Sequence, residues 1–296
     1  MKDSQVSDKP HQSLPLIHTE IWKEEPEADN RFATRAAYCR GYDVFGDMVG
    51  NARWVEMLFL LLRPELPQPA ALDLLEALAV ALANPGPRDP SVHAAMCGGI
   101  AGSNAAASLM AALAVGAGRY HGARDVHDAM LAWRACGMDA DAWRRHLRQA
   151  QAEDAAVIEV WPAREHPPGF EPHAPACATS TRQLLATLAR IGGTPRLNWL
   201  AAQREALEQA AGMPLEQTGV AAAAFSDLGL APEEGEMLFL LLRLPGAAMH
   251  ALEQQRKKYT EFPFYAVELQ EGAATGGERR DQRQDQQDQQ ESRQQA

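Results

Sequence analysis

The chain has 296 residues, 46% of them hydrophobic and 23% charged, which suffices for one large domain or two smaller ones. Its net charge of −11 argues against nucleic acid and anionic membrane surfaces as partners, because both attract clustered lysine and arginine. No apolar run is long enough to cross a bilayer, and the N-terminal residues lack the apolar core of a signal peptide. The four cysteines stand alone without a C-x-x-C pair, so we expect reduced thiols in a cytoplasmic protein.

The elements expected along the chain are helical, because no stretch sustains the alternation of β-branched and polar residues that is typical of a half-buried strand. Prolines at first-turn positions, glycine stops and capping residues set the expected bounds. The expected helices cover residues 54–63, 69–83, 89–118 with a bend near 98–99, 126–136, 139–160, 179–191, 195–211, 215–228 and 232–254. Residues 1–20 and the Gln/Arg/Asp-rich residues 271–296 contain too little apolar surface to order, and we expect both to be disordered.

One stretch, Ser103–His127, differs from the rest in composition. Its first half is almost entirely alanine with leucine, methionine and valine, which predicts a helix that is buried on all sides and lets another helix approach closely. The stretch breaks at Gly116-Ala117-Gly118 and then presents His121, followed by Gly122. On these residues alone, a core helix with a chance histidine and a helix that directs an imidazole into a cleft both remain open.

Several segments also follow one another in an order found in a known family. They are Arg40-Gly41-Tyr42-Asp43, Glu56–Arg63 with Glu65-Leu66-Pro67, Ser103–Gly122, Gly169-Phe170, Asp227-Leu228-Gly229 and Arg243–Glu253. Together they resemble the citrate synthase superfamily, and within it the shorter citryl-CoA lyase-like branch. The segment 243–253, which resembles R-x-x-G-x-x-A-H-x-x-E, is the most specific of them, and the likeness extends over residues 19–269.

This resemblance implies an all-α fold that works as a homodimer. A large helical domain, residues 21–122 and 228–270, and a small one, residues 123–227, are expected to surround a cleft. The implied chemistry is Claisen condensation or its reverse, in which an enolate made from a coenzyme A thioester attacks the ketone of a 2-oxo acid. The expected ligands are therefore an acyl-CoA and a small 2-oxo acid or similar compound, with no tightly bound cofactor and no metal.

Some family positions are kept here. His121 falls on the histidine of the family's H-G-G-A loop that meets the thioester enol oxygen, although the second glycine is missing. Arg243 falls on the arginine that binds a substrate carboxylate, a role that suits the forked guanidinium. Gly122, Gly169 and Phe170 also match, and the resemblance places them at the substrate site.

Other family positions are changed. Pro85 and Pro172 stand where the family has substrate-binding histidines, Phe262 stands at a terminal arginine, and Thr218 stands at the catalytic aspartate. A threonine cannot act as a general base near neutral pH without an activating partner. The replacement catalysts that the sequence offers nearby are His173 and Glu216, and Arg182 is the replacement for substrate binding. If residues 216–218 were helical, Glu216 would point about 200° away from Thr218.

Two functions of different classes remain. The first is an acyl-CoA-dependent acyltransferase or lyase that acts on a substrate other than citrate. The alternative is a citrate synthase-like protein without catalysis, which binds a CoA ligand or serves as partner subunit of an active paralogue. The retained His121 and Arg243 favour the enzyme, whereas Thr218 favours the alternative. A hydrogen bond between His121 and either His173 or Glu216 would favour the enzyme, and an apolar closure of the pocket would favour the alternative.

Overall fold

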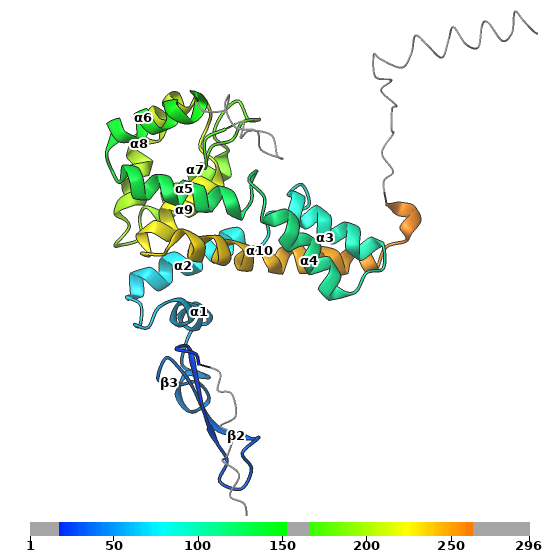
Figure 1. The fold of residues 1–296 in the computed structure, drawn as a ribbon. Helices are drawn as coiled ribbons and strands as arrows, with labels where there is room; N and C mark the ends of the chain where they lie inside the picture. The colour runs from blue at the N-terminus through cyan, green and yellow to red at the C-terminus, as the bar shows by residue number, and fades with distance from the viewer. Residues whose placement is uncertain (1–17, 153–165, 263–296) are drawn as a thin grey trace, which may run out of the picture. The chain divides into compact units, whose positions relative to one another are not determined.

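The computed structural model describes residues 18–152 and 166–262 of the chain (Figure 1). The chain divides into a main unit, residues 1–256, and a second unit, residues 257–296, whose described part contains the short 3₁₀ helix η3 (Tyr259–Glu261). The helices of the main unit are α1 (Trp54–Leu62), α2 (Pro69–Leu82), α3 (Pro90–Ile100), α4 (Ala105–Gly116), α5 (Ala123–Cys136), α6 (Ala140–Ala152), α7 (Thr179–Leu188), α8 (Pro195–Ala211), α9 (Gln217–Asp227) and α10 (Pro232–Gln255).

The predominantly helical class is confirmed. The expected disorder of residues 1–17 and 271–296 lies outside the described residues, and the division into domains 21–122 with 228–270 and 123–227 stays a prediction.

A small antiparallel sheet at the start of the main unit corrects the purely helical expectation. Its strands are β1 (Trp22–Pro26), β2 (Thr34–Cys39) and β3 (Tyr42–Asp43), followed by the π-helical turn η1 (Val44–Met48). The sequence pattern missed it because the buried side chains of β2 are Ala37 and Cys39, neither of which is β-branched. The two residues between β2 and β3, Arg40 and Gly41, both have positive φ, as a two-residue hairpin turn requires. The hairpin therefore explains why a glycine follows Arg40.

The main hydrophobic core gathers around α9, which is buried from Thr218 to Phe225. Its run of alanines presents little side chain, so that α5 can pack closely against it, and α5 also packs against α10. A Cβ on Gly235 would lie 2.3 Å from Met130 Sδ, which shows how closely the first half of α10 approaches α5. The expected glycine stop after α9 is confirmed: Gly229 has a φ of 72°, and the Leu230 amide donates to the Phe225 carbonyl at 3.0 Å.

A second, smaller cluster joins α3, α4 and the last part of α10. Its buried members are Val92, Ala95, Ala112, Ala247 and Ala251. The single helix expected over residues 89–118 is wrong, because the chain reverses between Ile100 and Ala105 and α4 packs back on α3. Two local features cause the reversal: Gly102 has a φ of 77°, and the Asn104 side chain accepts from the Ala107 amide and so caps α4.

Helix α4 is not buried on all sides, contrary to expectation. Within the described chain its buried residues are Ser108, Ala112 and Gly116, whereas Met110 and Val115 are 62% and 44% exposed. An apolar helix therefore presents an uncovered face. Among the described residues, no helix is both long and apolar enough to cross a membrane. All four cysteines are free thiols, as expected, although the cytoplasmic location itself stays a prediction.

Candidate active site

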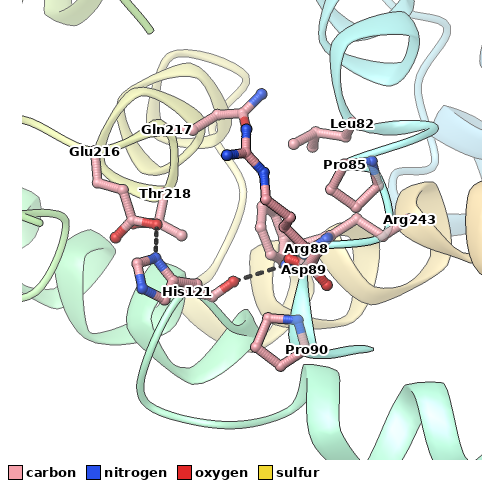
Figure 2. A pocket seen from close by; sticks show the side chains of 11 residues that line it. Leu82, Pro85, Arg88, Asp89, Pro90, His121, Glu216, Gln217, Thr218 and Arg243 are labelled. Carbon is pink, nitrogen blue, oxygen red and sulfur yellow. Dashed lines mark hydrogen bonds and ion pairs between the residues drawn. The ribbon is translucent and has the colours of Figure 1, made fainter. Parts of the chain in front are cut away.

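A cavity of about 290 Å³ opens beside the start of α9 and the middle of α10 (Figure 2). Its lining residues are Leu82, Pro85, Arg88, Asp89, Pro90, His121, Glu216, Gln217, Thr218, Phe239 and Arg243. They come from the turn between α2 and α3, the loop between α4 and α5, the start of α9 and the middle of α10. The polar part of the lining thus contains an imidazole, two guanidinium groups and two carboxylates.

The backbone of the α4–α5 loop fixes the imidazole of His121. His121 has a φ of 55°, and Arg243 Nη1 donates to its carbonyl oxygen at 2.7 Å. Gly122, which precedes the first residue of α5, lies so close to the preceding turn that a Cβ on it would sit 2.3 Å from the Gly118 carbonyl oxygen. Gly122 therefore serves close backbone packing, which holds His121 at the edge of the cavity.

Glu216 occupies the position just before α9 and has an extended backbone, with φ −102° and ψ 166°. Its amide donates to the Gly169 carbonyl at 2.9 Å, and Phe170 forms an isolated bridge with Leu215. The helical geometry that would point Glu216 about 200° away from Thr218 does not apply, because Glu216 precedes the helix; the Thr218 hydroxyl lies 3.2 Å from Glu216 Oε2. Gly169 and Phe170 consequently support the carboxylate rather than line the cavity.

His121 and Glu216 form the central contact of the site. The distance from His121 Nδ1 to Glu216 Oε1 is 2.6 Å, and Figure 2 shows the imidazole facing the carboxylate. Glu171 Oε2 lies 3.5 Å from the same nitrogen. The hydrogen bond that His121 donates to Glu216 outweighs the opposing effect of burial and raises the pKa of His121 to about 9, with the charges of Glu216, Glu171 and Asp125 adding to it. At neutral pH His121 is therefore an imidazolium whose Nδ1–H donates to Glu216.

A buried carboxylate lies behind this pair. Asp125, in the first turn of α5, is 0% exposed and accepts from the Gly169 amide at 3.0 Å and from the Thr218 hydroxyl at 2.6 Å. A threonine hydroxyl carries one proton, so the shorter distance assigns it to Asp125 rather than to Glu216. Thr218 thus lies between the two carboxylates and donates its hydrogen bond to Asp125. The sequence offered a weak sign of this role, an acidic residue four positions after His121.

Arg243 lines the cavity but is occupied within the protein. Its side chain forms an ion pair with Asp89 through Nη2, its Nη1 bonds the His121 carbonyl, and its guanidinium lies over the Phe239 ring at 4.8 Å. Arg243 is only 7% exposed, and Asp89 also caps α3 by accepting from the Ser91 amide at 2.9 Å. The arginine that was expected to bind a substrate carboxylate therefore has its charge balanced by a carboxylate of the chain.

The remaining candidates lie elsewhere. His173 is exposed, with its amide bonded to Glu171 Oε1 at 2.8 Å, and it does not line the cavity. Arg182 is exposed on α7, where its Nη2 donates to Thr179 Oγ1 at 3.0 Å. Sequence reasoning also missed Arg88 and Asp89 as cavity residues: Asp89 was expected only at the start of a helix, and Arg88 directly precedes it.

One group of side chains could hold a metal ion. Donor atoms of His121, Glu171 and Glu216 all lie within 4.8 Å of one another. A protonated imidazole between two carboxylates accounts for the same spacing, with Nδ1–H directed at Glu216. The expectation that the site works without a metal stays a prediction.

Comparison with known proteins points to one fold. No model of a known protein family matches the chain, and no curated protein matches it either. Citryl-CoA lyase from Hydrogenobacter thermophilus is structurally similar, with a TM-score of 0.61 and 20% identity over 87% of this chain and 97% of that chain.

Two larger enzymes share the same architecture. ATP citrate lyase from Methanothrix soehngenii, solved with citrate and coenzyme A, has a TM-score of 0.66 and 17% identity over 89% of this chain. ATP citrate lyase from Methanosaeta concilii, solved with (3S)-citryl-CoA, has a TM-score of 0.65 and 16% identity over 88% of this chain. The match spans 43% of each ATP citrate lyase chain. The chain therefore has the citrate synthase-like fold of citryl-CoA lyase.

Proposed function

We propose that the chain is a coenzyme A thioester-dependent enzyme that forms or cleaves a carbon–carbon bond, as an acyltransferase or a lyase, on a substrate other than citrate. The observation that carries the proposal is the 2.6 Å contact between His121 and Glu216 at the cavity. The contact joins the histidine that the family resemblance places at the thioester oxygen to a carboxylate beside it. It supplies the acid and the base that a Claisen-type reaction needs.

In the condensation direction, the Glu216 carboxylate removes a proton from the carbon next to the thioester carbonyl. The His121 imidazolium donates a hydrogen bond to the thioester oxygen while that oxygen takes up enolate charge. The enolate carbon then attacks the carbonyl carbon of the acceptor: one carbon–carbon bond forms, the carbonyl π bond opens, and the resulting alkoxide takes up a proton, which balances the one that Glu216 removed. In the cleavage direction that hydroxyl loses its proton, the carbon–carbon bond breaks as the acceptor carbonyl forms again, and Glu216 returns a proton to the carbon of the released thioester.

Thr218 stands at the position of the family's catalytic aspartate, but it does not conflict with this proposal. We assign the base to Glu216, which lies two residues closer to the N-terminus. The Gly169 carbonyl holds the backbone of Glu216, and Asp125 holds Thr218 beside it. Within the described residues, Glu216 Oε2 lies 3.2 Å from the Thr218 hydroxyl, a longer contact than the 2.6 Å between Glu216 Oε1 and His121. This oxygen is the one that we assign as the base.

We propose in addition that the enzyme works as a homodimer in which the uncovered face of α4 packs against a second copy. The support is the exposure of Met110 and Val115 on an otherwise apolar helix. Burial of large apolar side chains is the main favourable term in such an interface.

The test separates thioester enolisation from the overall reaction. The purified protein is incubated with acetyl-CoA and propionyl-CoA in D₂O, and exchange of the protons next to the carbonyl is followed by NMR. Glu216→Gln should slow the exchange by about 10²- to 10⁴-fold, the usual contribution of a general base. Glu171→Gln is the matched control, because its carboxylate lies 3.5 Å from His121 Nδ1 but outside the cavity lining, and it should change the rate far less.

Calorimetric titration with coenzyme A, with and without oxaloacetate, completes the test. Binding of coenzyme A without exchange by any thioester would show the non-catalytic CoA-binding protein instead. The absence of both binding and exchange would overturn the enzyme and the CoA-binding protein, and would leave the non-catalytic partner subunit of an active paralogue.

A further inference from the structure

The cavity carries one guanidinium group that the described part of the chain leaves unbalanced. Arg88 is exposed in the turn between α2 and α3 and lines the cavity together with His121 and Glu216. In residues 18–152 and 166–262 its side chain has neither a hydrogen bond nor an ion pair. The two other cationic groups of the lining are paired: Arg243 with Asp89, and His121 with Glu216.

The backbone under Arg88 is held on both sides. The Gly246 amide donates to the Ala83 carbonyl at 2.7 Å, and a Cβ on Gly246 would lie 2.6 Å from that same oxygen. His250 Nε2 lies 3.1 Å from Asn84 Oδ1, and Asp89 caps α3 directly after Arg88. The turn therefore presents Arg88 from a fixed position, although its side chain extends freely.

The charges of the lining favour an anion with a single carboxylate. The charges within the Arg243–Asp89 and His121–Glu216 pairs cancel, so Arg88 supplies the remaining positive charge of the lining. Glu171, which is not part of the lining, adds a negative charge 3.5 Å from His121. A ligand with one carboxylate can place it on Arg88 through two parallel hydrogen bonds. A second carboxylate would face Asp89 and Glu216 and would find no unpaired cation among the lining residues.

The rest of the lining is apolar on the side of the turn. Leu82 and Pro85 contribute to the wall there, and Phe239 of α10 adds an aromatic ring to the lining. These side chains suit an alkyl group rather than a second charged group. The acceptor carbonyl would then lie between Arg88 and the His121–Glu216 pair.

We propose that Arg88 binds the only carboxylate of the acceptor, and that the acceptor is a monocarboxylic 2-oxo acid with an apolar side chain. The inference rests on the proposed function and names the substrate class of the same site. Arg88 contacts the substrate in this proposal, whereas Arg243 positions His121 through the backbone carbonyl.

The experiment compares acceptors of different charge. Consumption of acetyl-CoA is measured with pyruvate, 2-oxoisovalerate and oxaloacetate as acceptors. The monocarboxylic acids should be preferred over oxaloacetate by at least about tenfold in kcat/KM. Arg88→Gln should raise KM for the monocarboxylic acids by about 10- to 100-fold, the effect of one lost charge-assisted contact, and change kcat far less.

Arg124→Gln is the matched control. Arg124 is an exposed arginine that pairs with Asp128 at 3.3 Å and does not line the cavity. This variant should keep the wild-type KM. Thermal unfolding and coenzyme A binding should be the same for both variants and the wild type.

Calorimetric binding of 2-oxoisovalerate in the presence of coenzyme A tests Arg88 even where turnover is absent. Wild-type binding that Arg88→Gln leaves intact would overturn the inference, and so would a preference for oxaloacetate. If Arg88→Gln weakens coenzyme A instead, Arg88 binds a phosphate of the thioester and the inference is wrong. Failure of the proposed function appears separately, as the absence of thioester proton exchange in the wild type.

Discussion

The two halves of α10 lie in regions that are built differently. The first half packs in the main core, whose fully buried side chains include Phe225, Met130 and Leu238. The second half packs against α3 and α4 through valine and alanine, and α4 leaves Met110 and Val115 exposed. The first region completes a core within the chain, whereas the second gains little from burial. The second region is therefore the one that the proposed second copy would cover.

The candidate site lies where α10 passes from one region to the other. Phe239 and Leu242 belong to the main core and Ala247 to the small cluster, with Arg243 between them. Arg243 joins the regions through Asp89 of the α2–α3 turn and the His121 carbonyl. A loose second region would therefore move both the turn and the imidazole.

We expect the largest effect on stability when the contacts of Arg243 with Asp89 and the His121 carbonyl are removed. Arg243→Met leaves Asp89 buried without its cation and should lower the free energy of unfolding by about 3–5 kcal/mol, as measured by urea denaturation. Arg53→Met is the control, because Arg53 forms partly exposed ion pairs with Asp73, at 3.0 Å, and with Glu76, and it should cost less than about 1 kcal/mol. Equal losses in the two variants would show that Asp89 is solvated and that the regions are not joined here.

The next largest effect on stability should come from disturbing the packing of α3 against α10 in the small cluster. A Cβ on Gly99 would lie 2.2 Å from the Ala251 carbonyl oxygen, which belongs to the backbone of α10. Gly99→Ala should therefore destabilise the protein by about 1–3 kcal/mol, although alanine favours a helix. Gly192→Ala is the control, since a Cβ there would meet only Ala70 Cβ at 3.9 Å. A stabilised Gly99→Ala protein would show that α3 and α10 are free to separate.

A substitution on the exposed face of α4 should have a smaller effect, on the affinity of the proposed dimer, which depends on protein concentration. If a second copy covers this face, Met110→Lys should weaken the dimer by about tenfold or more, because a lysine would lose hydration in the interface. Light scattering over a range of concentrations measures the change. Val80→Lys is the control, because Val80 is also exposed but lies on α2. A wild-type protein that stays monomeric at high concentration would contradict the dimer.

The sequence predicted most helices because local signals set their ends. Pro195 begins α8 and Gly229 follows α9 with positive φ, as the pattern indicated. The sheet and the α3–α4 reversal were missed because small residues, Ala37 in β2 and Gly102 in the reversal, carry no periodic hydrophobic signal. Local sequence signals therefore specify where a helix forms, whereas the path of the chain between helices depends on packing.

The site could be predicted only in part for a related reason. His121 and Glu216 were both candidates, but their contact depends on the extended backbone that Gly169 imposes on Glu216. The pairing of Arg243 with Asp89 joins residues 154 positions apart, and no local pattern encodes it. Family resemblance therefore located the imidazole and the arginine, and the three-dimensional contacts reassigned what the arginine does.

The smallest effect is the pH dependence of the His121–Glu216 pair. The pKa of His121 is raised from 6.5 to about 9 in the folded protein, so its stabilising contribution is complete below pH 6.5 and is lost as the pH rises through 9. His121→Asn removes the imidazole and keeps a residue that tolerates positive φ. The difference in unfolding free energy between the wild type and this variant should fall between pH 6.5 and pH 9. Because the side chain of His121 is 32% exposed, solvent screens the pair and the fall should stay below about 1 kcal/mol.

The same titration should appear in catalysis. Thioester exchange should be constant from pH 6.5 to pH 8 and should decline near pH 9, when the imidazolium loses the proton that it offers to the enolate oxygen. In Glu216→Gln the main cause of the raised pKa is gone, so any residual exchange should decline at a lower pH. A rate that rises through pH 9 would mean that neutral His121 is the working form, and Glu216 would then orient the ring instead of charging it.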